Sequence, residues 1–412
     1  MTYVYRCELC GQEFPGDEIH YRCSSCNGPL LITYDYQHLK GRVTATKLAG
    51  TGPGLWRYKA LLPVQPNTEV ITLGEGGTPL LAPRKLARLL GLSQLLIKYE
   101  GSNPTGSFKD RGTAVGMTVA VEREFNAVGT VSHGNMGTSV AAYAARAGRI
   151  CYLIAPANIT STRLLFLSVY GAKVLQVTGR YDSMYDESIR IGQKTNVFFI
   201  NCDNPFRIEG HKTLAFEISE GLDWDVPDWI VAPASSGGMV SALYKGFLEL
   251  HTLGIVSGIP KIAVVQPEDA QPIVEAFERG TAVKPMKYES DSIVRSLGNP
   301  YPPSGDLVVK RLRDLDGTAI AVSDEETVAA QRELARLEGI CAEPAGAITL
   351  AGLRRLLELG RVKKSDKVVL IVSGFGFRDP GEPQRLVDEP ITVDIKELES
   401  VVSSYLLGRQ GG

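Results

Sequence analysis

Short apolar runs alternate with helical spacings along most of this chain, and this alternation limits the folds open to it. Runs such as 94–99 and 368–373 have the length of buried strands and end at turn residues. Between the runs, apolar residues follow helical spacing, for example over 137–147 and 181–193. The predicted strands are 94–99, 127–132, 149–155, 172–177, 197–201, 229–232, 262–265, 319–323 and 368–373. Because parallel strands need crossover connections, we predict an α/β fold with two open, largely parallel sheets, helices on both faces and the active site in the cleft between them.

Four of the seven cysteines form two Cys-x2-Cys pairs near the start of the chain. These residues are Cys7, Cys10, Cys23 and Cys26. Four thiolates at this spacing can surround one tetrahedral ion, as in zinc ribbons. A disulfide framework is the alternative, but it suits small secreted domains. We therefore predict a small ribbon domain with a structural zinc ion, which could stabilise the domain alone or also dock a partner.

Charge and composition exclude several classes of partner. The 412 residues carry a net charge of −2 and are 44% hydrophobic, which is typical of a globular protein. A net charge near zero does not favour nucleic acid or an anionic membrane. We find no apolar run long enough to span a bilayer and no signal-peptide pattern. The expected protein is cytoplasmic and has no nucleic-acid or membrane partner.

Lys109 stands on a tight turn between a predicted strand and a predicted helix. Strand 94–99 is broken by Asn103, Pro104 and Gly106, and helical spacing begins after Gly112. Catalytic groups concentrate on such turns in α/β proteins. A lysine becomes a nucleophile toward an aldehyde when burial and neighbouring charge lower its pKa. A surface lysine is the common alternative for a lone lysine, but the Gly- and Ser-bearing turn favours a catalytic one.

Three further turns also follow predicted strands and precede glycine-rich or helical segments. In the segment 131–139 a strand runs into the start of a helix near Asn135. Free backbone amides at a helix start favour an anion, although Asn and Gly there also form an ordinary helix N-cap. The turn 233–239 can cradle a phosphate with its backbone amides. Ser373 ends strand 368–373 just before another glycine turn. A plain turn is the alternative reading of each.

The string NPTGSFKDRG, from Asn103 to Gly112, resembles the signature of threonine synthases, which are fold type II enzymes that use pyridoxal 5′-phosphate. The other turns occur in the order of that family, whose catalytic core begins with a segment similar to 73–80. The resemblance implies that Lys109, beside Phe108, forms the Schiff base with the cofactor, and that Asn135 contacts the 3′-oxygen. It also implies that Ser373 faces the pyridine nitrogen. The implied phosphate-binding residues are Ser235, Ser236, Gly237, Gly238 and Met239, of which the serines and the methionine depart from the usual Gly-Asn pattern. The cysteine pairs are similar to a zinc ribbon of some archaeal threonine synthases.

The same resemblance implies the reaction of a lyase in threonine biosynthesis. O-phospho-L-homoserine and water would give L-threonine and phosphate through an aldimine at Lys109, γ-elimination and β-addition of water. Ser107, Ser132 and Asn204 match positions of the family's substrate pocket, and Arg180 stands where an asparagine is usual. Arg180 could bind the substrate phosphate with its planar fork of donors.

Departures from the family pattern at Met136, Arg180 and Asp186 leave the amino-acid substrate open. Met136 offers no strong donor, and Asp186 would repel a phosphate dianion. A threonine or serine dehydratase, or a synthase acting on O-phosphoserine, is therefore the second reading. A partner-binding protein with a degenerate catalytic body is the third, but the retained Lys109 argues against it. Enzymes of this type are often dimers, so a homodimer is possible.

The predicted boundaries divide the chain into a ribbon and two larger units. We expect the zinc ribbon at 1–40, a linker with the first part of the large cofactor domain at 41–91, the smaller α/β domain with Lys109 and Asn135 at 92–212, and the large α/β domain with the phosphate loop and Ser373 at 213–400. The segment 284–316 is rich in Pro, Gly and charge and could be a loop or an insert near the cleft.

Overall fold

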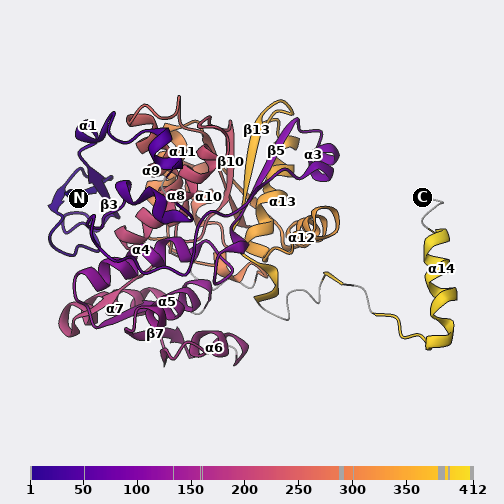
Figure 1. The fold of residues 1–412 in the computed structure, drawn as a ribbon, viewed down its shortest axis with the longest axis horizontal. Helices are drawn as coiled ribbons and strands as arrows, with labels where there is room; N and C mark the ends of the chain where they lie inside the picture. The colour runs from indigo at the N-terminus through magenta and orange to yellow at the C-terminus, as the bar shows by residue number, and fades with distance from the viewer. Residues whose placement is uncertain are drawn as a thin grey trace.

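The structure is a computed structural model that describes residues 2–408 except 51, 133, 158, 160, 287–291, 300, 379–385 and 388–389. The described residues form three sheets: a small antiparallel one near the N-terminus and two larger ones with helices packed around them (Figure 1). The larger sheets are parallel except for one edge strand. The predicted α/β fold with two largely parallel sheets is therefore confirmed.

The larger sheet has six strands in the order β12-β11-β10-β13-β5-β4. Its strands are β4 (Leu80–Leu81), β5 (Gln94–Tyr99), β10 (Trp229–Pro233), β11 (Lys261–Pro267), β12 (Thr318–Val322) and β13 (Lys367–Val372). Alternate residues of the inner strands point to opposite faces, and both faces are buried, as in other parallel sheets. One face packs against α3 (Arg84–Leu90), α12 (Asp324–Glu338) and α13 (Pro344–Glu358). The other packs against α8 (Pro205–Glu220), α9 (Gly238–Thr252), α10 (Pro272–Arg279) and α11 (Gly305–Asp314).

The second parallel sheet has four strands in the order β8-β7-β6-β9. Its strands are β6 (Ala127–Val131), β7 (Ile150–Pro156), β8 (Lys173–Val177) and β9 (Val197–Phe199). Helices α4 (Lys109–Glu122) and α5 (Asn135–Arg146) share a hydrophobic core with one face, and α7 (Tyr181–Thr195) packs against the other. Helix α6 (Ser161–Ser168) packs near α5 and β8.

The N-terminal sheet has the order β2-β1-β3, with β1 at Tyr3–Cys7, β2 at Glu13–Pro15 and β3 at Leu30–Tyr34. It lies beside α8 and α9 in Figure 1, and its apolar residues join the core of the smaller parallel sheet. The polar stretch after it contains α1 (Tyr36–Leu39), α2 (Ala45–Ala49) and the 3-10 helix η1 (Leu55–Leu61). Asp35 and Thr44 cap the first two helices by accepting backbone N–H bonds.

The remaining described elements are short, apart from a C-terminal helix. They are η2 (Glu100–Ser102), η3 (Arg295–Leu297), η4 (Gly376–Arg378), η6 (Ile395–Glu397) and α14 (Leu398–Gly408). Figure 1 shows α14 away from the two sheets. Among the described residues, no helix is both long and apolar enough to cross a bilayer. The predicted domain boundaries stay a prediction, although β5, which they place in the smaller unit, is a strand of the six-stranded sheet.

Candidate active site

Three turns that carry predicted site residues lie at the carboxyl ends of strands in the six-stranded sheet. They follow β5, β13 and β10, which are adjacent and parallel. Because the carboxyl ends of parallel strands meet at the same edge, the turns come together there. The backbone joins two of them, since the Phe108 N–H donates to the carbonyl oxygen of Ser373 at 3.1 Å and Ser107 forms a β-bridge with Gly374. Lys109 and Ser373 are thereby neighbours in the fold.

Lys109 is the first residue of α4, and its side chain is partly buried. The side-chain nitrogen lies 4.2 Å from the centre of the Phe108 ring. Burial, followed by the positive charge of Arg207, lowers the pKa of Lys109 to about 8. With such a pKa about one molecule in ten carries the neutral amine at pH 7, against about one in 2,500 for an ordinary lysine. Lys109 is therefore suited to attack an aldehyde.

Asp110 fixes the turn of Lys109 relative to α5. Its carboxylate accepts hydrogen bonds from the backbone N–H and the hydroxyl of Thr105, at 2.7 and 2.6 Å. It also accepts one from the hydroxyl of Ser139 at 2.6 Å. Thr105 belongs to the turn and Ser139 to α5, the helix that Asn135 begins. The turn of Lys109 and the helix that Asn135 begins are thus held by one buried carboxylate.

Glu343, which no sequence motif singled out, joins two of the predicted cofactor contacts. Its carboxylate accepts a hydrogen bond from the Asn135 amide nitrogen at 2.7 Å and one from the Ser373 hydroxyl at 3.1 Å. Glu343 is 8% exposed and occupies the N-cap of α13, where the helix dipole favours a negative charge. A Cβ on Gly374 would lie 2.4 Å from its carboxylate, so a larger residue there would displace the Glu343 side chain. The sequence signal was an acid directly before a proline that starts a helix.

Two residues of α8 also lie near Lys109 and were missed by the motifs. Arg207 is buried and donates to the hydroxyl of Thr113, one turn after Lys109 in α4, at 3.0 Å. His211 is 3% exposed and packs on the Phe108 ring with centroids 4.9 Å apart. Burial and then the charge of Arg207 lower the pKa of His211 well below its ordinary value, so its ring is neutral at pH 7. Both face the lysine from a helix with no distinctive apolar pattern.

The predicted phosphate loop has the form of an anion site. Gly237 is the N-cap of α9 with φ +89°, and no side chain in the described part of the protein caps this helix. The first backbone N–H groups of α9 therefore lack intrahelical acceptors and can bind an anion. A Cβ on Gly237 would lie 2.9 Å from the Val308 side chain. Ser304 holds the loop by donating its N–H to the Ser236 carbonyl at 3.0 Å, so the described part of 284–316 borders this loop.

The four predicted substrate residues differ in burial and in the bonds that their side chains make. Ser107 is fully buried, and its hydroxyl has no hydrogen-bond partner among the described residues. The Ser132 hydroxyl accepts the N–H bonds of Gly134 and Gly137 at the start of α5, at 3.3 and 3.1 Å. Asn204 caps α8, since its side chain accepts from the Phe206 N–H at 2.9 Å and donates to the Phe199 carbonyl at 3.1 Å. Arg180 is exposed at the N-cap of α7.

Met136 and Asp186, two of the departures from the family pattern, differ in burial. Met136 is 6% exposed and follows Asn135 in α5, whereas Asp186 is exposed on α7. Neither contradicts the reading of the lysine site.

The four N-terminal cysteines come together. Their sulfur atoms all lie within 4.8 Å of one another, with Cys7 and Cys26 at 3.4 Å and Cys10 and Cys23 at 3.6 Å. These separations are too long for disulfides. Four sulfurs bound at about 2.3 Å to a tetrahedral ion would be about 3.8 Å apart. The donor set and its size therefore fit one zinc ion.

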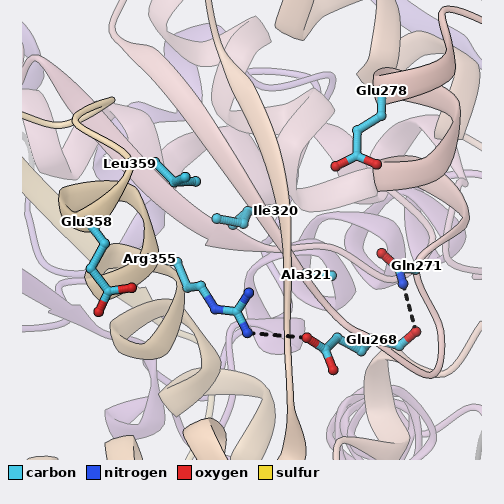
Figure 2. A pocket seen from close by; sticks show the side chains of 8 residues that line it. All are labelled: Glu268, Gln271, Glu278, Ile320, Ala321, Arg355, Glu358 and Leu359. Atoms are coloured by element: carbon cyan, nitrogen blue, oxygen red, sulfur yellow. Dashed lines mark hydrogen bonds and ion pairs between the residues drawn. The ribbon is translucent and has the colours of Figure 1, made fainter.

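A separate cavity of about 590 Å³ lies at the β12 edge of the large sheet (Figure 2). Its lining residues are Glu268, Gln271, Glu278, Ile320, Ala321, Arg355, Glu358 and Leu359. Arg355 is already paired with Glu326 at 2.6 Å and with Glu268 at 3.3 Å. None of the predicted site residues lines this cavity.

Comparison with known sequences identifies the family. Residues 71–374 match the family described as pyridoxal-phosphate dependent enzyme. The chain is 42% identical to the threonine synthase of Methanocaldococcus jannaschii over 394 residues, which is 95% of this chain and 96% of the relative. It is 39% identical to the threonine synthase of Methanosarcina acetivorans over 393 residues, with the same coverage.

Solved structures share the fold. Maize serine racemase has a TM-score of 0.62 and 23% identity, covering 81% of this chain and 93% of the racemase. The processed form of threonine deaminase isoform 2 from Solanum lycopersicum has a TM-score of 0.63 and 20% identity, covering 86% of this chain and 95% of the deaminase. The chain therefore belongs to the pyridoxal-phosphate-dependent enzymes and, within them, to the threonine synthase family.

Proposed function

We propose that this protein converts O-phospho-L-homoserine and water into L-threonine and phosphate, with pyridoxal phosphate attached to Lys109. The proposal is carried by one observation. A lysine with a lowered pKa, the bridge Asn135–Glu343–Ser373 and the uncapped N-terminus of α9 lie together near the carboxyl ends of β5, β10 and β13. Relatives named threonine synthase that align over 95% of the chain support this reaction over others of the same fold.

Each site residue has a proposed task. The Lys109 amine would hold the cofactor through its aldehyde and, once the substrate amine has replaced it there, would be free to take the proton from the substrate Cα. The N-terminal amides of α9, in the turn from Ser235 to Met239, hold the cofactor phosphate. Asn135 and Ser373 orient the ring. When bound, pyridoxal phosphate supplies an electron sink for negative charge at the substrate carbon.

The proposed substrate residues divide into two kinds. Ser107 stands two residues before Lys109, and its buried hydroxyl has no hydrogen-bond partner among the described residues. It can therefore bind the substrate directly. Ser132 and Asn204 have their side chains engaged as caps, so they act by shaping the starts of α5 and α8. Arg180 adds a positive charge at the start of α7, where it can meet the substrate phosphate.

The test is product identification with two substrates. Purified protein loaded with pyridoxal phosphate is incubated with O-phosphohomoserine, and in parallel with threonine. We expect threonine and phosphate in equal amounts from the first and no 2-oxobutanoate from the second. Formation of 2-oxobutanoate from threonine, without threonine synthesis, would instead establish the dehydratase reading.

We also propose that Cys7, Cys10, Cys23 and Cys26 hold a structural zinc ion, as the sulfur separations support. Metal analysis of the full chain is expected to give one zinc per chain. Cys10→Ser should lose the metal, whereas the control Cys151→Ala, at a buried cysteine outside the cluster, should keep it. A metal-free protein with four intact thiols would refute this part.

A further inference from the structure

The N-terminal ribbon contacts the turn 201–204 that follows β9. The hydroxyl of Tyr21 accepts a hydrogen bond from the Phe199 N–H at 3.2 Å. Next to it, the guanidinium of Arg22 pairs with the carboxylate of Asp203 at 2.8 Å. Arg22 directly precedes Cys23 of the four-cysteine cluster. The ribbon thus holds the smaller sheet at the end of one of its strands.

This turn touches three parts of the candidate active site. A Cβ on Gly238 would lie 3.0 Å from the Cys202 carbonyl oxygen, so the turn rests on the start of the phosphate loop helix. The Asn201 side chain accepts the Val131 N–H at 3.0 Å, at the end of β6. Asn204 starts α8, the helix that carries Arg207. A shift of the turn would therefore move the phosphate loop, the strand before Asn135 and the charge that faces Lys109.

The position of the turn depends on a charge from the ribbon. The Asp203 side chain is 1% exposed, and burial raises its pKa although Arg22 partly offsets this. A buried carboxylate that loses its charged partner is costly, so the ion pair with Arg22 stabilises Asp203 in this place. Arg22 is in turn held by the backbone around Cys23, whose N–H donates to the Gly28 carbonyl at 3.0 Å. An ion bound by the four cysteines would fix that backbone.

We propose that Arg22 is a positioning residue of the active site, through which the metal-filled ribbon keeps the turn 201–204 against the phosphate loop. This rests on the proposed function for the cofactor and the metal. The ribbon then stabilises the site from outside. Its removal would shift the turn 201–204 and the phosphate loop without changing any residue that contacts the substrate.

The test compares two arginine variants of the zinc-loaded full chain. Arg22→Met removes the charge that faces Asp203. Arg6→Met is the matched control, because Arg6 pairs with Glu13 inside the ribbon at 4.0 Å and both side chains are half exposed. Hydrogen exchange of the backbone over 199–207 is measured by mass spectrometry. We expect exchange there to rise at least about tenfold in Arg22→Met and to stay unchanged in Arg6→Met.

Further variants separate positioning from general damage. Arg22→Lys keeps the charge and should restore most of the protection. When Asp203→Asn is already present, adding Arg22→Met should have little further effect, because the pair is already broken. If Arg22→Met does not fold, Asp203→Asn alone should raise exchange over 199–207. Unchanged exchange there in the folded Arg22 and Asp203 variants, or an equal rise in Arg6→Met, would overturn the proposal.

Metal removal gives a second measurement. Chelating the ion from the full chain should raise exchange in 199–207 as well as in the ribbon, and lower the affinity for pyridoxal phosphate. If exchange rises in the ribbon alone, the coupling does not exist. Zinc content and cofactor absorbance are recorded for each sample. A protein that binds neither contradicts the proposed function, whereas the comparison of Arg22 with Arg6 still decides the positioning role.

Discussion

The reactivity of Lys109 depends on two physical causes that can be separated by mutation. Burial lowers its pKa first and Arg207 adds to this, whereas Cys202 and Glu343 act in the opposite direction. Since the neutral amine is the nucleophile, attachment of pyridoxal phosphate to the apoprotein should accelerate with rising pH around a midpoint near 8 and then level off. In Arg207→Met the midpoint should move to higher pH, because a repelling charge is gone.

Stopped-flow absorbance at a series of pH values measures both midpoints. Arg207→Lys keeps the charge and serves as the control. A midpoint near the ordinary lysine value in the wild type, or one that Arg207→Met leaves in place, would show that this environment does not tune Lys109.

Glu343 is expected to strengthen cofactor binding by holding Asn135 and Ser373. Glu343→Gln keeps the size of the side chain but removes the charge that accepts from both Asn135 and Ser373. Because a hydrogen bond to a charged group contributes about 1.5–3 kcal/mol, we expect the affinity for pyridoxal phosphate to fall roughly ten- to hundredfold.

Equilibrium titration of the apoprotein, followed by absorbance, measures this loss. Glu358→Gln, at the exposed far end of α13, should bind the cofactor like the wild type. Equal affinities for Glu343→Gln and the wild type would mean that the bridge does not organise the site.

The sequence reveals single site residues to different extents. Lys109, Asn135 and Ser373 lie in strand-to-turn segments whose local pattern predicts a site. Glu343 and Arg207 come from other helices, and only tertiary packing brings them to that site. Local patterns also cannot show that the side chains of Ser132 and Asn204 are already engaged as caps. The roles of all these residues in binding stay predictions.

The burial of α8 is hard to predict from its sequence, although this helix contacts several other elements. It is buried along nearly its whole length, although it carries Arg207, Glu209, Lys212 and Glu217. Such a helix shows no apolar stripe, because its charges are satisfied by partners on other elements. Glu209 accepts from the Tyr34 hydroxyl of the ribbon at 2.5 Å, and Glu217 pairs with Arg111 of α4 at 2.7 Å.

The pairing of Arg111 yields a stability prediction. Arg111 is fully buried and binds Glu100 at 2.6 Å and Glu217 at 2.7 Å. Burial alone would raise the pKa of Glu217, but the charges of Arg111 and Lys98 hold it well below its ordinary value. Arg111→Met removes the positive charge that pairs with the buried carboxylates of Glu100 and Glu217. We therefore expect a loss of about 3–5 kcal/mol in the free energy of unfolding.

Urea unfolding of the cofactor-free protein checks this value. The control Arg354→Met breaks a surface pair with Glu333 and should cost less than about 1 kcal/mol. Similar costs for the two variants would contradict the importance of the buried cluster.

For the whole molecule, the alternation of strands and helices predicts two parallel sheets, and the structure has them. The sequence does not show which strand joins which sheet. β5 pairs with β13, with Leu96 opposite Val369, and this long-range pairing places the turn of Lys109 next to Ser373. Because such pairing is decided by packing over the whole chain, the position of the Lys109 turn beside Ser373 follows from the fold and not from any motif.

The central claim is that Lys109 of this site carries pyridoxal phosphate. Reduction of the loaded protein with borohydride fixes the cofactor to its lysine, and peptide mass spectrometry then locates it. We expect the pyridoxyl group on Lys109 and no label at the site in Lys109→Ala. A label on another lysine, such as Lys98 or Lys212, or no label in the wild type, would contradict it.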